Sequence, residues 1–402
     1  MIPQPLMAIK RLGKNVLILS VCQALGLSGV PLVLLLGGII GSELAPSEKW
    51  ATLPIAIVVI GIALFSIPAA MVMKWIGRKR GFIISSAVGS AATLGAAFAI
   101  SVQSFSLFCF MVLFIGGSTA FIAQYRFAAA ESVEQKYSAR AVSFVLIGGI
   151  VAGFLGPEIG RDGKDWLGFG DYTGSFVAMA LMFALSGVLL LFISEKAVKK
   201  ESVMEQERPL KAVVSQRTFL VAAISSAIAF GAMGFIMSAT PLSMHVIDRF
   251  SLNSTTIVIQ SHIIGMYLPS LFSGFLVERL GVKTLQILGV AGMCVAAVAA
   301  AASHQFVFYL VALTFLGIGW NFLFVAGTVM LTHSYRSVER FKAQGINDFA
   351  VFTFQALAIL SAGLVLSAAG WEVLNLVTIP FLLITLVMVI TTRSAAKKQT
   401  GF

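Results

Sequence analysis

Two pairs of soft ligand side chains stand at helical spacing in neighbouring apolar segments of the chain. Met233 and Met237 form the first pair, and His262 and Met266 form the second. A separation of four residues puts both members of a pair on one face of a helix. If these helices run antiparallel through a short turn near Arg249, residues equally far from the turn lie at one depth. We therefore expect Met237 to face His262 and Met233 to face Met266, as two rungs of a ladder.

Three thioethers and one imidazole are ligands that copper accepts more readily than hard cations do. The pattern therefore predicts a copper path through a membrane. Chance alone readily produces a Met-x-x-x-Met in a chain with 15 methionines, whereas four histidines make His-x-x-x-Met scarcer. The structural alternatives are that the methionines only fill space in the core and that His262 is a hydrogen-bonded interior histidine.

The composition indicates an integral membrane protein. Hydrophobic residues make up 58% of the chain and charged residues 11%. The apolar segments are about 20 residues long, enough for a helix to cross a hydrocarbon core of roughly 30 Å. We expect an all-α protein without a cleavable signal peptide. Its twelve predicted transmembrane helices are centred near residues 27, 62, 92, 116, 150, 183, 232, 266, 294, 318, 357 and 382.

Basic residues gather in alternate connections between these segments. Most lie in 10–14, 74–80, 196–217, 336–342 and 393–398, whereas the opposite side has only Lys49, Arg161, Lys164 and Arg249. This asymmetry predicts a bacterial inner-membrane protein with both termini in the cytoplasm. It also accounts for the net charge of +11 through topology and lipid contact, with no nucleic-acid partner.

The chain reads as two halves of six spans each. We expect an N-terminal bundle at 1–193, a polar cytoplasmic linker at 194–217 and a C-terminal bundle at 218–402. Even span counts give the halves the same orientation, as in parallel six-helix repeats. An internal similarity supports the repeat, because AMVMKWIGRKR from Ala70 corresponds to GFLVERLGVK from Gly274.

This layout resembles the major facilitator superfamily and its cytoplasmic loop motif. The second-half loop matches the motif at Gly274, Glu278, Arg279, Gly281 and Lys283. The resemblance implies two six-helix bundles that work by alternating access. The first-half copy departs from the motif, with Ala70, Lys74 and Trp75 at the positions of its first Gly, its acid and its Arg.

Two further stretches carry the resemblance. The segment GGIVAGFLGPEIG, at 148–160, is similar to the Gly-Pro motif of the fifth span, where glycines permit close helix approach and Pro157 can bend the helix. The two ligand pairs, with GWNFLFVAGTVMLTHSY and QGINDF further on, resemble the CcoA-like bacterial copper importers.

That resemblance implies a secondary transporter, not an enzyme, which imports copper and supplies it for cytochrome oxidase assembly. It implies no cofactor besides the transported ion, and a monomer is the expected form. The same family includes riboflavin carriers. The alternatives are therefore a transporter of riboflavin or another small organic molecule, or a proton-coupled drug exporter.

Several other polar residues fall at the ends of predicted spans. Met244 and His245 would receive copper on the outer side, or act as interfacial anchors. Asp348, next to Asn347 at the predicted start of span eleven, would couple a proton or release the ion, or cap the helix. Glu158 is a second coupling candidate, although acids at helix ends are common.

The remaining chemistry is sparse. Trp320 and Asn321 in span ten are expected to line a cavity, and in a riboflavin carrier they would contact the rings. Cys22, Cys109 and Cys294 fall in separate spans and indicate neither a disulfide nor a thiolate site. No nucleotide-binding loop or catalytic triad is present, which argues against an ATP-driven pump.

Overall fold

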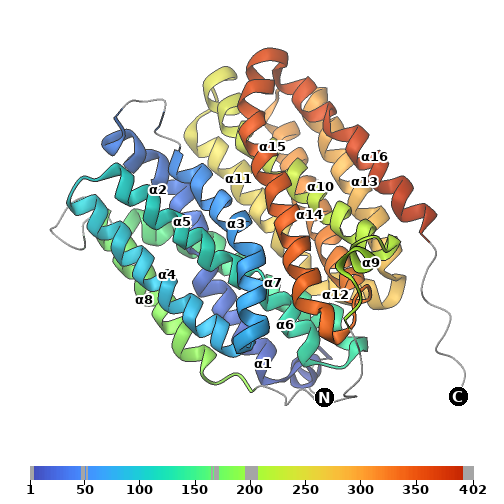
Figure 1. Ribbon diagram of the computed structural model, residues 1–402. Helices are drawn as coiled ribbons and strands as arrows, with labels where there is room; N and C mark the ends of the chain where they lie inside the picture. Colours follow the sequence, from blue (N-terminus) through green and yellow to red (C-terminus); the bar gives the residue numbers. More distant parts are fainter. Residues whose placement is uncertain are drawn as a thin grey trace, which may run out of the picture. The chain divides into compact units, whose positions relative to one another are not determined.

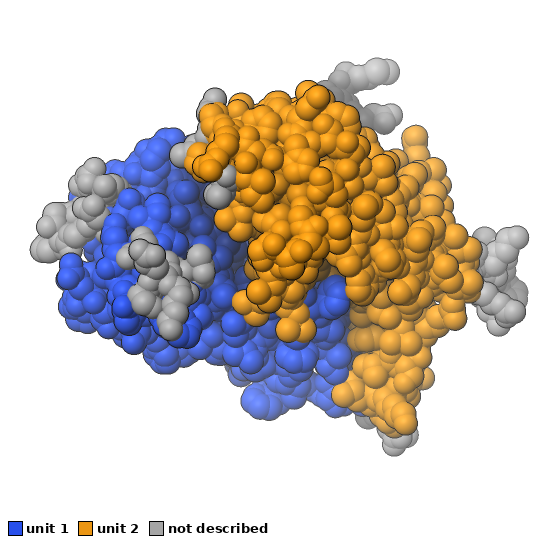
Figure 2. All heavy atoms as spheres, turned by 90° about the horizontal axis from the view of Figure 1, so that it is seen from above, with its two compact units in different colours: residues 1–207, 337–356 blue, residues 208–336, 357–402 orange. Residues whose placement is uncertain are grey.

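The computed structural model describes residues 4–46, 50, 53–163, 166, 172–194 and 207–392, and its regular elements in these ranges are helical. The chain divides into two compact units, which Figure 2 distinguishes by colour: unit 1 comprises residues 1–207 and 337–356, and unit 2 comprises 208–336 and 357–402. The division falls within the predicted linker, and residues 337–356 group with unit 1. The domain boundaries at 193 and 218 remain predictions.

The helices of unit 1 pack through small residues. Glycine at 61 and 116 allows α3 to approach α5 closely, since a Cβ on Gly116 would collide with the carbonyl oxygen of Val58. Helices α4 and α8 also lie side by side (Figure 1). The elements are α1 (Gln4–Leu27), α2 (Gly29–Leu44), α3 (Leu53–Ile76), α4 (Arg78–Ser101), α5 (Phe105–Ile122), α6 (Tyr125–Ser132), α7 (Ser138–Asp162), α8 (Thr173–Leu190) and the first part of α15 (Arg340–Leu376).

Unit 2 is organised around α14, which packs against α10, α11 and α13. A π-helix, η4, continues α10 into the turn before α11, and this turn includes Arg249, as the sequence predicts. The elements are α9 (Leu210–Val214), α10 (Arg217–Pro241), η4 (Leu242–Ile247), α11 (Leu252–Tyr267), α12 (Ser270–Leu280), α13 (Val282–Ala302), α14 (Phe306–Thr332), the second part of α15 and α16 (Thr378–Thr391).

The described residues contain ten stretches long and apolar enough to cross a membrane, or eleven when a bent pair of helices is included. The bent pair is α11 with α12, which change direction by 40°. The stretch Ser337–Thr391 spans 55 residues and holds both α15 and α16, where the sequence predicts two separate spans. The prediction of an all-α, multi-pass membrane protein is confirmed.

The two copies of the repeated loop share one backbone feature. Gly77 joins α3 to α4 with φ of 87°, and Gly281 joins α12 to α13 with φ of 83°. This left-handed conformation is available to glycine without steric cost and is unfavourable for other residues. Each glycine therefore lets the chain leave one helix and start the next within a single residue.

Candidate functional site

His262 is completely buried on the face of α11 that packs against α14. Its Nδ1 lies 2.9 Å from the carbonyl oxygen of Leu313. Because a carbonyl can only accept a hydrogen bond, Nδ1 carries the hydrogen, and the neutral ring then has its lone pair on Nε2. Among the described residues, Nε2 has no hydrogen-bond partner. The imidazole is thus held by one nitrogen, while the other is available to a ligand or a metal ion.

Close approach of the helix backbones explains this placement. A Cβ on Gly317 of α14 would lie 2.5 Å from the carbonyl oxygen of His262 and 2.7 Å from the amide nitrogen of Met266. Only glycine fits at such a crossing without pushing α11 away. Gly317 therefore allows the part of α11 that carries His262 and Met266 to pack closely against α14.

An aromatic cluster centred on Trp320 connects α10, α11 and α14. The Trp320 ring lies 5.0 Å from Phe230 of α10 and 5.8 Å from Tyr267 of α11, in edge-to-face arrangements, and stacks at 5.0 Å on Phe324. These separations are typical of favourable aromatic pairs. Trp320 is buried, and its Nε1–H has no hydrogen-bond partner among the described residues.

Asn321 stabilises the break between α11 and α12. Its side-chain amide nitrogen donates to the carbonyl oxygen of Met266 at 2.7 Å and lies 2.6 Å from Oγ of Ser270. Its side-chain oxygen is buried and has no partner in the described part of the chain. Broken helices of this kind present backbone and side-chain polar groups to substrates in membrane transporters.

Two of the candidate copper ligands lie near the Trp320 cluster along their helices. Met233 and Met266 are buried and Met237 is half-buried. Met233 lies one helical turn beyond Phe230, and Met266 directly precedes Tyr267, so both methionines adjoin residues that contact Trp320. In the described ranges, no group of three or more His, Cys, Asp and Glu side chains could hold a metal ion. The thioether ladder stays a prediction.

Asp348 has a different setting from the one expected at a helix start. Helix α15 begins at Arg340, so Asp348 lies within the helix and the capping alternative is wrong. Its carboxylate is buried and forms an ion pair with Arg126 of α6. The side-chain amides of Gln124 and Asn347 donate to it at 2.6 and 2.9 Å. A carboxylate with this many donors is stabilised in its charged form inside the apolar unit.

The basic residues of the first-half loop find acids elsewhere in unit 1. Arg78 donates to Glu131 at 2.9 Å, and Arg340 lies 3.3 Å from the other oxygen of the same carboxylate. Lys74, at the position where the motif has an acid, pairs with Glu207. The departure from the family motif is thus compensated by Glu131 of α6 and by Glu207 within the predicted linker.

The motif residues of the second-half loop have a simpler setting. The side chains of Glu278 and Arg279 are exposed at the end of α12, and Gly274 is buried one turn earlier. Lys283 donates to the carbonyl oxygen of Ile390 at 2.7 Å, which ties α13 to the end of α16. This loop therefore fixes helix ends within unit 2.

The residues expected at the outer helix ends are dispersed. Met244 is buried within η4, and the carbonyl oxygen of Met244 accepts a hydrogen bond from the amide of Phe250. The His245 side chain is exposed, and its Nδ1 lies 2.7 Å from the Phe250 carbonyl oxygen. Glu158 pairs with Arg161 on an exposed face of α7. None of these contacts joins them to the Trp320 cluster.

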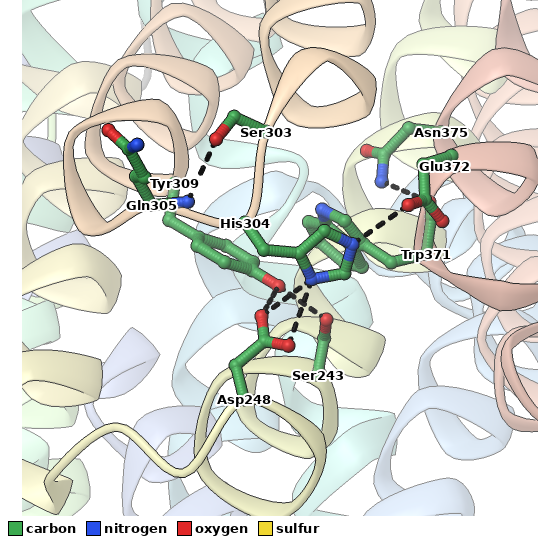
Figure 3. Close-up of polar contacts among 9 residues, drawn as sticks. All are labelled: Ser243, Asp248, Ser303, His304, Gln305, Tyr309, Trp371, Glu372 and Asn375. Carbon is green, nitrogen blue, oxygen red and sulfur yellow. Dashed lines mark hydrogen bonds and ion pairs between the residues drawn. The ribbon is translucent and has the colours of Figure 1, made fainter.

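Sequence reasoning missed a polar cluster at one end of unit 2 (Figure 3). Nδ1 of His304 lies 2.7 Å from Asp248, Nε2 lies 2.9 Å from Glu372, and the Tyr309 hydroxyl donates to Asp248 at 2.7 Å. Burial disfavours the charged imidazole, but the hydrogen bonds to Glu372 and Asp248 outweigh it and raise the pKa of His304. One feature of the sequence could have indicated this cluster: His304 lies in a polar connection between two predicted spans, and the chain has only four histidines.

Comparison with known proteins identifies the family. The sequence profile of the Major Facilitator Superfamily matches residues 16–268 and 223–401. The chain is 34% identical, over 94% of its length and 95% of the relative's, to the riboflavin transporter RfnT of Brucella anthropi. In fold it is similar to the proton:xylose symporter XylE, with a TM-score of 0.78 and 12% identity over 94% of this chain and 95% of that one.

A second solved structure has the same fold. The fucose:proton symporter FucP of E. coli superposes with a TM-score of 0.73 and 13% identity, covering 94% of this chain and 98% of that one. The profile match and the extended similarity to RfnT agree with the helical architecture and with the loop motif around Gly281. The chain therefore belongs to the major facilitator superfamily and is a multi-pass membrane transporter.

Proposed function

We propose that this transporter carries riboflavin or a molecule with the same flavin ring system. The observation that carries the proposal is the 34% identity to a riboflavin transporter across nearly the whole of both chains. The alignment extends over nearly the whole of both chains, so it includes the helices that would line a transport path. The basic residues predict an inner-membrane protein with cytoplasmic termini, and within that orientation we propose import as the direction of transport.

The Trp320 cluster supports a planar substrate. A flavin has a flat face for stacking and a polar edge with carbonyl acceptors and an imide N–H donor. The Trp320 Nε1–H and the Asn321 side-chain oxygen are a donor and an acceptor without partners among the described residues. A substrate that satisfies both groups removes the cost of leaving them buried and unpaired, which is about 1–3 kcal/mol each.

Riboflavin uptake tests this proposal. In a bacterium that neither makes nor imports riboflavin, expression of the chain should restore growth on low riboflavin and uptake of the labelled vitamin. Trp320→Phe keeps the ring and removes the N–H donor, so it should lower uptake about tenfold, the equivalent of about 1.4 kcal/mol. Trp75→Phe is the matched control, because Trp75 is 74% exposed and lies outside the cluster. Absence of uptake from normally expressed protein would overturn the proposal.

Copper is the second candidate substrate, because His262 presents an unpartnered Nε2. Histidine ligands of metal ions usually donate their other ring nitrogen to a carbonyl or carboxylate, and the Leu313 carbonyl has that role here. Met233, Met237 and Met266 would supply the thioethers that favour copper, above all Cu(I), over zinc or manganese. In that case the imported copper would serve assembly of a copper enzyme such as cytochrome oxidase.

A copper experiment is designed around volume-conserving changes. Met237→Leu and His262→Gln should each abolish labelled copper accumulation at unchanged protein level, because they remove ligand atoms and keep most of the side-chain volume. Met293→Leu, at a buried methionine of α13 outside the ligand set, should leave it unchanged. Excess zinc should compete poorly. Equal uptake by all variants would contradict a copper site.

Measuring both substrates in the same cells separates the candidates. A flavin carrier shows riboflavin uptake that responds to Trp320→Phe and not to Met237→Leu. A copper importer shows the opposite dependence. The two outcomes rest on different side chains of one region, so either result assigns the region a substrate.

A further inference from the structure

We propose that His304, Asp248 and Glu372 form a proton-binding site. When the imidazole is protonated, the site holds three segments of unit 2 together, and when the imidazole loses its proton the segments separate. The three residues are called the His304 site below. The ligand of this site is a proton, whichever of the two substrates is transported.

The hydrogen-bond geometry requires a proton. Nδ1 of His304 lies 2.9 and 2.7 Å from the two carboxylate oxygens of Asp248, and Nε2 lies 2.9 Å from Glu372. Ionised carboxylates only accept hydrogen bonds, and a neutral imidazole has one N–H to donate. Both contacts are hydrogen bonds at once only if the ring carries two hydrogens or a carboxyl group carries one. The arrangement in Figure 3 therefore holds one proton more than the deprotonated set of three groups.

The site joins segments that are distant in sequence. Asp248 stands in the turn between η4 and α11, His304 in the connection between α13 and α14, and Glu372 in the second part of α15. Glu372 follows Gly370, where φ of 82° interrupts the helical geometry of α15. One proton thus holds together a turn, a connection and the segment that follows a helix break.

Loss of the proton has a defined consequence. Asp248 would keep the hydrogen bond from Tyr309, but one of the two contacts of His304 would lose its hydrogen and two carboxylates would face a neutral ring. The negatively charged carboxylates of Asp248 and Glu372 would then repel each other across the neutral ring. Separation of Glu372 from His304 would relieve this repulsion at the lowest energetic cost, because the hydrogen bond from Tyr309 holds Asp248 in place.

The turn at Asp248 has strained backbone geometry. Arg249, the next residue, has φ of 60°, which is strained for a residue other than glycine. The preceding π-helix η4 is itself a rare geometry that is concentrated at functional sites. Release of the carboxylate would let this segment relax, and it carries Met244 and His245.

We expect His304, and not the other titratable groups around it, to change protonation as the external pH changes. Its contacts among the described residues are Asp248, Glu372 and the ring of Tyr309. His245, in the same turn, bonds the Phe250 carbonyl oxygen, and Arg249 is exposed. The His304 side chain is 37% exposed, so protons exchange with water directly. By the charge asymmetry of the sequence this end of unit 2 faces outward, and external pH sets the state of the site.

Histidine NMR on the purified full-length protein in detergent tests the proposal without any substrate. With 13C-labelled histidine there are four imidazole signals, and His304→Gln assigns the one of interest. We expect His304 to be protonated at neutral pH, and Glu372→Gln to move its midpoint down by about one pH unit. Glu158→Gln, at an exposed acid of unit 1, should not move it.

A second readout reports the release itself. Trp371 is buried and lies 5.1 Å from the Tyr309 ring, so its fluorescence should change across the His304 titration. Trp371→Phe should remove this change, and His304→Gln should abolish its pH dependence. A neutral His304 at pH 7, a midpoint insensitive to Glu372→Gln, or fluorescence that ignores the titration would each overturn the proposal. Failure of riboflavin uptake would not affect these measurements.

Discussion

The buried Arg126–Asp348 ion pair allows an asymmetric prediction about stability. Asp348→Asn removes the carboxylate and leaves the Arg126 guanidinium in the apolar interior, where it cannot release its proton. Arg126→Gln leaves the Asp348 carboxylate, which can be neutralised by taking up a proton. The two variants break the same ion pair, so any difference between them comes from this chemical asymmetry.

The magnitudes follow from burial. Removing one partner of a buried ion pair costs about 3–5 kcal/mol, and Asp348→Asn should cost this amount at any pH between 5 and 8. For Arg126→Gln, protonation of Asp348 limits the loss of folding free energy to about 4 kcal/mol at pH 7. An aspartic acid in water binds its proton near pH 4, and each pH unit between there and pH 7 costs about 1.4 kcal/mol. The native state of this variant holds a proton on Asp348, so the upper limit on its destabilisation falls by about 1.4 kcal/mol for each unit that the pH is lowered.

Unfolding of the detergent-solubilised protein by heat or denaturant at pH 5, 6, 7 and 8 measures the effect. The double variant Asp348→Asn with Arg126→Gln completes the cycle and should be more stable than Asp348→Asn alone, because it also removes the buried guanidinium. Equal pH slopes for the two single variants would refute the reasoning. So would additive losses in the double variant, which would mean that the two side chains contribute independently.

Two further predictions concern packing and pH. Gly317→Ala should destabilise the protein by about 1–3 kcal/mol and reduce transport, because its Cβ would meet backbone atoms of α11, whereas Gly363→Ala, with open space around it, should be neutral in thermal unfolding and uptake assays. The His304 site should stabilise unit 2 fully below the unfolded pKa of histidine, about 6.5, and this contribution should be lost as pH rises through the raised pKa of the folded protein. Melting temperatures of the wild type and of His304→Gln should therefore converge at alkaline pH, and a constant difference would contradict the assignment.

The sequence determined the helical, multi-pass architecture through local properties. Membrane burial depends on the summed hydropathy of about 20 consecutive residues, which can be read directly from the chain. The turn at Arg249 and the common face of Met233 and Met237 are equally local, since they depend on charge and on the helical repeat. The sequence motif around Gly281 identified the superfamily for the same reason.

Tertiary structure alone decided which polar groups meet. Arg126 and Asp348 are separated by 222 residues, and His304 lies 56 and 68 residues from its two acids. No periodicity links positions so far apart, because their distance depends on how whole helices pack. Asp348 looked like a helix cap because the polar residues before it resemble a loop. In the structure those residues are helical, and Arg340 and Lys342 in the first turn pair with Glu131 and Glu207 of unit 1, contacts that exist only in the folded chain.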